Sequence, residues 1–137
     1  PALRAALALN SGDLDSKTEL GRALYMMGKE EGIEALRSVL RARPNDPKAA
    51  LYLALHLVRE GKQSEAMTYL HRAAASGEAE YAEAFYHLAL LYKERSEPVR
   101  AFKLLGDYLD KSRPSDPYRK DAESVRRALA RQIGDGG

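Results

Sequence analysis

Apolar residues recur at the spacing of an α-helix between Pro47 and Lys62, in the stretch PKAALYLALHLVREGK. They stand at positions i, i+3, i+4 and i+7, which form one stripe of an amphipathic helix: Ala50, Leu53, Ala54 and Leu57. Gly61 marks the expected end of this helix. A second helix follows directly, and its apolar face consists of Ala66, Leu70 and Ala73. These two stretches therefore predict a helical hairpin.

The same arrangement returns 35 residues further along the chain, between Ala82 and Leu109. Four pairs of residues share this spacing: Leu53 and Leu88, Ala54 and Ala89, Gly61 and Ser96, and Ala66 and Ala101. We expect the alanines where the two helices of a hairpin cross, because only small side chains let two helix backbones approach closely. We expect Ser96 to cap the second helix of its hairpin, and Pro98 suits the first turn of that helix.

Weaker copies of the pattern lie on both sides of these hairpins. Residues 14–46 predict another hairpin, in which Gly32 stands where the others have alanine. Residues 1–13 match the end of a second helix, with Leu3, Ala6 and Leu7 as apolar positions. Residues 116–132 predict one more helix, whose single apolar stripe suits the end of a stack because it offers no apolar face to a successor. We expect residues 133–137 to form a flexible tail.

This pattern resembles the tetratricopeptide repeat (TPR), with its small residues at the crossing and in the turn and its alanine opening the second helix. The match is close for residues 47–81 and 82–115 and looser for residues 14–46. The resemblance implies a single all-α domain over residues 1–137, a TPR-like helical-hairpin solenoid wound into a right-handed superhelix. It also implies that the first helices of the hairpins line a concave face, where a helix or an extended segment of a partner lies.

Composition excludes several kinds of site. The chain has no cysteine, which rules out disulfides, thiolate zinc sites and cysteine nucleophiles. Lys+Arg number 22 and Asp+Glu 20, and both signs are interspersed along the predicted helices, which gives little support to nucleic-acid binding. No apolar run approaches the roughly 20 residues that a membrane-spanning helix needs.

The sequence carries no familiar catalytic or cofactor motif. We find no P-loop, dinucleotide-binding, HExxH or GxSxG pattern. His56, His71 and His87 are separated by 15 and 16 residues, which places them on successive helices, and we expect them to be surface or groove residues. We therefore expect a protein that is not an enzyme and that uses no cofactor and no metal.

The first helices carry more apolar surface than one hairpin partner covers. Beyond the packing stripe, Leu51 and Leu55 of one hairpin correspond to Tyr86 and Leu90 of the next. Two interpretations stay open: these residues pack against neighbouring first helices, or they form the floor of a partner-binding groove. The residues predicted to line such a groove are Arg22, Tyr25, Leu51, Tyr52, Leu55, Tyr86, His87, Leu90 and Lys93.

One form of the TPR family grips the C-terminal carboxylate of a peptide with lysines, asparagines and an arginine. The matching positions here are Thr18, Arg22, Tyr52, Glu83 and His87. Only Arg22 is suited to that task, and a buried carboxylate would lack the paired donors that offset its desolvation. An amphipathic ligand is therefore expected rather than a chain terminus.

The sequence predicts a protein-interaction scaffold that binds an amphipathic helix or extended segment of a partner protein, within a larger protein or assembly. One alternative is an oligomerisation or structural module, in which the N-terminal end from Leu3 to Leu9 docks onto another copy of the chain or onto a preceding repeat. A further alternative is an accessory domain of an enzyme or a membrane-anchored protein. Nucleic-acid binding and direct membrane insertion are not expected, and the sequence indicates no compartment.

Overall fold

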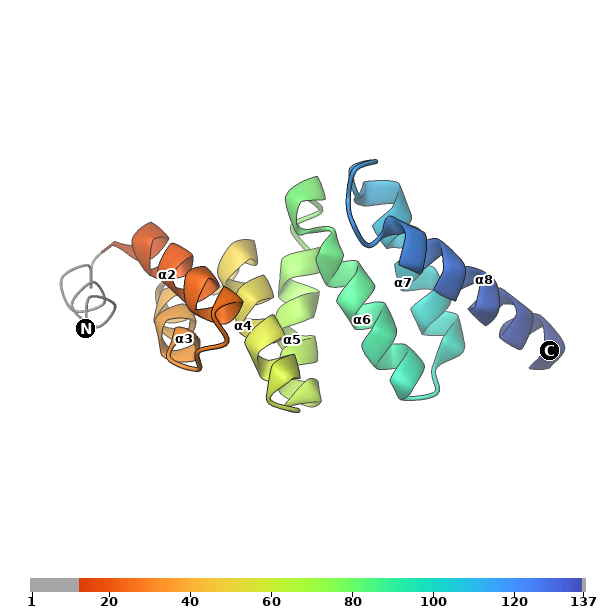
Figure 1. Cartoon of the computed structure of the whole chain (residues 1–137), viewed down its shortest axis with the longest axis horizontal. Helices are drawn as coiled ribbons and strands as arrows, with labels where there is room; N and C mark the ends of the chain where they lie inside the picture. Colours follow the sequence, from red (N-terminus) through yellow and green to blue (C-terminus); the bar gives the residue numbers. More distant parts are fainter. Residues whose placement is uncertain (1–12, 137) are drawn as a thin grey trace. The chain divides into compact units, whose positions relative to one another are not determined.

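In the computed structural model, residues 13–136 are described, and they form helices joined by short connections (Figure 1). This part of the chain contains no β-strand. The elements are α2 (Leu14–Met26), α3 (Gly32–Ala42), α4 (Pro47–Arg59), α5 (Gln63–Ala74), the 3₁₀-helix η1 (Ala79–Tyr81), α6 (Glu83–Glu94), α7 (Pro98–Lys111) and α8 (Arg119–Gly136). The predicted all-α helical-hairpin fold is confirmed, because α2–α3, α4–α5 and α6–α7 coincide with the predicted hairpins.

The chain divides into two compact units, of which the first ends at Ala73 and the second begins at Ala74. In the first unit α3 packs against α2 and α4, and α2 also packs against α4. In the second unit α7 packs against α6 and α8. A first helix such as α2 thus contacts both its own hairpin partner and the next first helix, which is how helical repeats share an apolar core.

Aspartates set the start of the first helix in two hairpins. The Asp13 carboxylate accepts a hydrogen bond from the Ser16 amide at 3.0 Å, and the Asp46 carboxylate accepts one from the Ala49 amide at 3.0 Å. Each bond satisfies an amide that has no partner inside its helix. Pro47 begins α4, where its missing N–H leaves no helical hydrogen bond unmade.

The first helix of every hairpin ends in the same kind of turn. Gly28, Gly61 and Ser96 occupy this turn in left-handed conformations, with φ of 72°, 79° and 60°. The next residue donates its amide to the carbonyl five residues earlier, and the three bonds join Lys29 to Leu24, Lys62 to Leu57 and Glu97 to Tyr92 at 2.8, 2.8 and 3.0 Å. This pattern is the Schellman motif, which ends a helix at a left-handed residue.

The prediction that Ser96 caps α7 is wrong. The residue before α7 is Glu97, and no side-chain hydrogen bond caps that helix. Ser96 lies instead at the end of α6, where its backbone takes the conformation that glycine takes at position 61. The small residue in the turn is therefore required by the backbone conformation and not by space, since a Cβ on Gly28 or Gly61 would have no neighbour within 4 Å.

We expect Ser96→Gly to stabilise the chain by about 1 kcal/mol, because a left-handed residue other than glycine is strained by about that amount. The reciprocal change, Gly61→Ala, should destabilise it by about 1 kcal/mol for the same reason. Urea unfolding followed by circular dichroism measures both effects. Unchanged midpoints in the two variants would show that the turn conformation is not a constraint.

Small residues occupy the predicted crossings of the hairpins. Ala54 and Ala66 are fully buried, as are Ala89 and Ala101 to within 1%. Gly21 holds the equivalent place in the first hairpin, and a Cβ there would lie 2.4 Å from Cγ of Leu36 on α3. Alanine therefore suffices at the later crossings, whereas the α2–α3 crossing requires glycine.

Gly32 differs from the alanines of the other hairpins because His56 packs onto it. A Cβ at Gly32 would lie 2.6 Å from Nε2 of His56. His56 is only 2% exposed, and its Nε2 lies 3.3 Å from the carbonyl oxygen of Gly21. His56 is therefore not an exposed surface residue, because its ring fills the space that Gly32 leaves.

Helix α8 continues to Gly136, so residues 133–136 are helical where a flexible tail was expected. Residues 1–12, with the predicted apolar positions Leu3, Ala6 and Leu7, lie outside the described residues. Within residues 13–136 no helix combines the length and the apolar character required to cross a membrane.

Candidate functional site

Two tyrosines and two arginines from α2 and α4 meet on the first unit. The ring centroids of Tyr25 and Tyr52 are 6.0 Å apart. The guanidinium carbon of Arg22 lies 5.9 Å from the Tyr52 ring centroid, and that of Arg59 lies 4.0 Å from the Tyr25 ring centroid. Arg59 also donates a hydrogen bond of 2.9 Å to the carbonyl oxygen of Tyr25. We call these four residues the tyrosine–arginine face.

The predicted groove residues of the first unit separate into interior and surface positions. Leu51 is 2% exposed and Leu55 8% exposed, so both leucines belong to the packed interior. Tyr25 and Tyr52 are half-buried, and Arg22 is exposed. The predicted groove residues that remain accessible on the first unit are therefore Arg22 and the two tyrosines.

Arg59 of this face and the exposed Met26, which follows Tyr25 in the sequence, were not among the predicted site residues. Arg59 stands seven residues after Tyr52 on α4, and this spacing of two helical turns could have indicated that they share a side of the helix. Met26 follows Tyr25 and is 68% exposed, which is unusual for a large apolar side chain. Its exposure had no signal in the sequence, because the apolar spacing alone does not say which positions a neighbouring helix covers.

In the second unit Tyr86 is covered by Tyr118, which directly precedes α8. It is 7% exposed, and its ring stacks on that of Tyr118 with centroids 4.6 Å apart and an angle of 18° between the rings. The Tyr86 hydroxyl donates a hydrogen bond of 2.5 Å to Asp121. Burial is the main cause that raises the pKa of Tyr86 above its ordinary value. Tyr86 therefore joins α6 to α8 in this structure.

His87 lies in the same aromatic cluster. Its ring meets the Tyr118 ring edge-on with centroids 5.4 Å apart, and its Nε2 is buried with no hydrogen-bond partner among the described residues. Burial lowers the pKa of His87 to about 4, and the nearby Asp116 opposes that shift. Burial likewise raises the pKa of Glu83 on α6, and Asp116 adds to this shift. The folded chain therefore favours the neutral form of both side chains.

We expect the chain to lose stability as the pH falls from about 7 toward about 5, since a buried neutral histidine resists protonation. In the unfolded chain His87 binds a proton near its ordinary pKa of about 6.5, whereas the folded chain binds it only near pH 4. His56, whose pKa is also lowered by burial, acts in the same direction. Urea unfolding across this pH range measures the loss.

The matched variant for this pH prediction is His87→Gln, which cannot bind the proton. The contribution of Glu83 has the opposite sign, because its pKa is raised, and it is shared by both proteins. We therefore expect the variant to have a flatter dependence of stability on pH than the parent chain. Parallel curves for the two proteins would contradict the role given to His87.

The remaining predicted residues of the second unit are accessible. Leu90 is half-buried and Lys93 is exposed, and both stand on α6. The accessible face of α6 is therefore smaller than the sequence predicts, because the Tyr118 ring packs against Tyr86 and His87. Leu90 and Lys93 are the predicted groove residues of α6 that Tyr118 does not cover.

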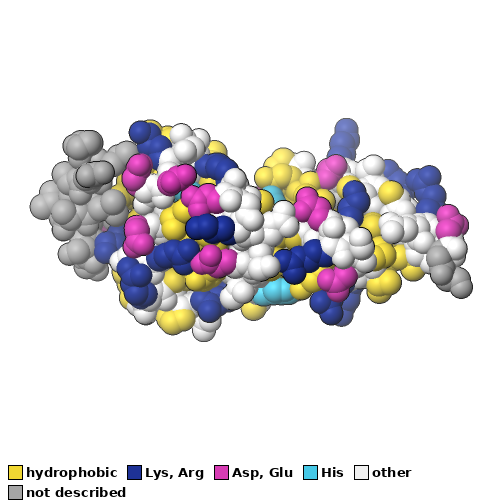
Figure 2. All heavy atoms as spheres, turned by 90° about the horizontal axis from the view of Figure 1, so that it is seen from below, with side chains coloured by type: hydrophobic (Ala, Val, Ile, Leu, Met, Phe, Trp, Pro, Cys, Tyr) yellow, Lys and Arg dark blue, Asp and Glu magenta, His cyan; other side chains and the backbone are white. Residues whose placement is uncertain are grey.

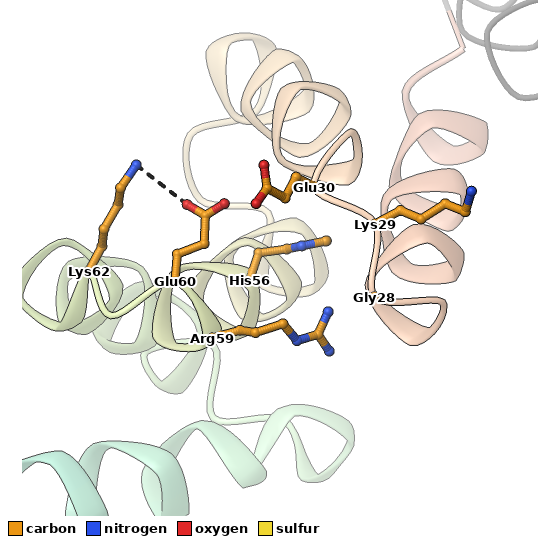
Figure 3. Close-up of a pocket in the computed structure, with 7 residues that line it drawn as sticks. All are labelled: Gly28, Lys29, Glu30, His56, Arg59, Glu60 and Lys62. Atoms are coloured by element: carbon orange, nitrogen blue, oxygen red, sulfur yellow. Dashed lines mark ion pairs between the residues drawn. The ribbon is translucent and has the colours of Figure 1, made fainter.

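A polar pocket of about 390 Å³ opens at the turn end of the first unit (Figure 3). It is lined by Gly28, Lys29, Glu30, His56, Arg59, Glu60 and Lys62. Figure 3 shows the side chains of His56 and Arg59 extending from α4 into this region, while that of Lys29 points away from it. Lys62 is paired with Glu60 at 3.4 Å. Because the charges are mixed and partly paired, the pocket presents no defined anion or cation site.

The surface shows no field of a single charge sign on the face drawn in Figure 2. Lys and Arg side chains alternate there with Asp and Glu, most densely over the first unit. Among residues 13–136 no group of three or more His, Cys, Asp or Glu side chains is arranged to hold a metal ion.

Comparison with known proteins supports the fold. No protein-family model matches the chain, and no curated protein matches its sequence. Among solved structures, a crystal structure of MamA superposes with a TM-score of 0.80 at 20% identity, covering 97% of this chain and 75% of that one. A second MamA crystal structure gives a TM-score of 0.73 at 19% identity, with 97% and 78% covered. The all-α helical-repeat fold is therefore shared with MamA.

Proposed function

We propose that this chain is a non-catalytic scaffold of the TPR type, whose first helices bind an amphipathic helix or an extended segment of a partner protein. The tyrosine–arginine face is the observation that carries the proposal. Tyrosine and arginine are enriched among the residues that dominate binding energy at protein interfaces. Three hairpins that share one turn motif support the assignment of residues 14–46, 47–81 and 82–115 as repeats and of residues 116–132 as a closing helix.

The tyrosine–arginine face is suited to a segment with both apolar and acidic side chains. Arg59 is already held by its hydrogen bond and by the Tyr25 ring, so little side-chain freedom is lost when a partner binds. Arg22 pairs with Glu19 only at 3.9 Å and at the surface, where such a pair contributes little. A carboxylate of the partner can therefore replace Glu19 as the partner of Arg22.

In the second unit we propose Leu90 and Lys93 of α6 as contacts of the same kind. Leu90 offers an apolar contact and Lys93 a charged one, and they stand three residues apart on one side of the helix. We assign a structural role to Tyr86 and His87 instead, because both rings contact Tyr118 and thereby hold the closing helix against α6. A scaffold with separate contacts on its repeats is typical of helical-repeat proteins.

Tyr52→Ala and Arg22→Glu are expected to weaken binding of peptides selected on the parent chain from a random peptide library. An aromatic anchor commonly contributes about 2 kcal/mol or more, which corresponds to about thirtyfold in Kd. Fluorescence anisotropy with the selected, labelled peptides measures the change. Circular dichroism confirms that both variants remain folded, since Arg22 is exposed and Tyr52 half-buried.

The matched control is Tyr69→Ala on α5. Tyr69 also lies beside an arginine, with the guanidinium carbon of Arg72 5.1 Å from its ring centroid, but it belongs to the second helix of its hairpin. Its loss should leave peptide affinity unchanged. Equal losses in Tyr69→Ala and Tyr52→Ala, unchanged affinity in both first-helix variants, or failure to select any peptide would each overturn the proposal.

A further inference from the structure

A groove runs between α7 and α8, the last two helices of the second unit. It has a volume of about 330 Å³, and its lining consists of Phe102 and Leu109 of α7 and Glu123, Arg126, Arg127 and Ala130 of α8. Since α7 packs against α8, the groove is built entirely within the second unit. Phe102 and Leu109 are half-buried and Ala130 is exposed, so the apolar lining remains open to solvent on one side.

Arg126 gives this groove its chemical character. Its guanidinium carbon lies 4.2 Å from the Phe102 ring centroid, and its Nη2 is 3.1 Å from where a Cβ on Gly106 would lie. Glycine at position 106 thus lets the guanidinium lie close against α7. The Nε of Arg126 is buried without a hydrogen-bond partner among the described residues. Such a donor is unfavourable until it meets an acceptor, and a carboxylate is the strongest acceptor for a guanidinium.

The charges around the groove leave it net positive. Arg126 and Arg127 stand against one acidic residue, Glu123. Neither arginine forms an ion pair with an acidic side chain in the described part of the chain. The complementary ligand therefore carries negative charge beside its apolar contacts.

The length of the groove fits a helix. Phe102 and Leu109 are seven residues apart on α7, as Glu123 and Ala130 are on α8. At 1.5 Å per residue each pair spans about 10 Å, or two helical turns. An amphipathic helix that uses positions i, i+3 or i+4 and i+7 presents an apolar stripe of that length.

We propose that the groove between α7 and α8 binds an amphipathic helix of a partner protein, with apolar side chains on Phe102 and Leu109 and a Glu or Asp carboxylate on Arg126. This surface is independent of the tyrosine–arginine face and of Leu90 and Lys93. The chain would then hold one partner on its first helices and an acidic helix on the outer side of its last hairpin.

The test uses the full chain and three synthetic helical peptides of about 15 residues. All have leucines at positions i, i+3 and i+7, flanked by glutamates in the first peptide and by lysines in the second. The third peptide contains the glutamates but has its leucines scrambled around the helix. We expect the first to bind with a Kd at least about tenfold below those of the other two, as measured by fluorescence anisotropy. Binding should shift the NMR signals of Phe102, Leu109 and Ala130.

Two variants of α8, in each of which glutamate replaces an alanine, provide the matched comparison. Ala130→Glu places bulk and negative charge in the groove, whereas Ala128→Glu makes the same change at an exposed position outside the lining. We expect the first variant to weaken binding of the acidic peptide by about tenfold or more and the second to leave it unchanged. Circular dichroism checks that both remain folded.

Several results would overturn this proposal. They are the absence of binding by the acidic peptide, equal binding by the lysine peptide, and equal effects of the two alanine variants. Tighter binding of a single-stranded oligonucleotide that Ala130→Glu abolishes would make nucleic acid the ligand instead. A dimer that Ala130→Glu converts to a monomer in light scattering would make a second copy of the chain the occupant.

Discussion

Replacing Gly32 with alanine is expected to destabilise the chain by about 1–3 kcal/mol, the usual cost of overpacking a well-filled interior. The added Cβ would lie 2.6 Å from Nε2 of His56 and 2.9 Å from the carbonyl oxygen of Gly21. One contact is with a buried side chain and the other with backbone, so neither gives way easily. Urea unfolding followed by circular dichroism measures the change in the free energy of unfolding.

The cause of that loss is tested by a double-mutant cycle with His56→Ala. Removing the imidazole removes the nearer contact, so Gly32→Ala should cost less in the His56→Ala background, with a coupling of about 0.5–3 kcal/mol. Gly134→Ala in α8 is the control, because no atom lies within 4 Å of a Cβ there. Alanine at Gly134 should be neutral or stabilising, by up to about 1 kcal/mol. Additive effects of Gly32→Ala and His56→Ala would contradict the packing argument.

Deleting residues 116–137 is expected to destabilise the second unit strongly and to promote self-association. The deletion removes Asp116, which accepts a hydrogen bond from Tyr108, and Tyr118, which stacks on Tyr86. Exposing two large buried side chains costs about 3–6 kcal/mol, which is comparable with the stability of a whole small domain. Thermal unfolding by circular dichroism and light scattering across protein concentrations measure the two effects.

The control for this deletion removes only residues 134–137. Gly134 has open space around it, so the shorter deletion should leave both the melting temperature and the molecular mass unchanged. Arg119→Ala provides a point test, since Arg119 donates to the carbonyl of Leu109 at 2.8 Å and to the Ser112 hydroxyl at 2.6 Å. If the long deletion yields a monomer with an unchanged melting temperature, α8 does not close the stack.

The two predictions above both depend on contacts between residues that are far apart in the sequence. His56 reaches Gly32 across 24 residues, and Tyr118 reaches Tyr86 across 32 residues. His56 fills the space beside Gly32 of the preceding hairpin, and Tyr118 of the closing segment covers Tyr86 of the last hairpin. At Gly32 the departure from the repeat pattern leaves the space that His56 of the next hairpin fills. This is the expected behaviour of a fold whose stability depends on contacts between adjacent repeats.

The sequence by itself determined the helices and their order, because those features follow from interactions between residues close along the chain. The 3.6-residue period of apolar positions indicated each amphipathic helix, and Pro47 lies where α4 begins. The recurrence of small residues at Gly61 and Ser96 located the turns. The sequence predicted that Ser96 begins α7, whereas Ser96 ends α6, because a serine suits both a helix start and a helix end.

Only the tertiary structure decided which apolar and aromatic positions remain at the surface. Tyr52 and Tyr86 were both predicted to line the groove, yet Tyr52 is half-buried on an accessible face while Tyr86 lies beneath Tyr118. Helical periodicity defines a face but not the side chain that a distant segment brings against it. The groove between α7 and α8 likewise exists only because these two helices pack side by side. Its lining residues come from both helices, so no spacing along the sequence predicts that they lie together.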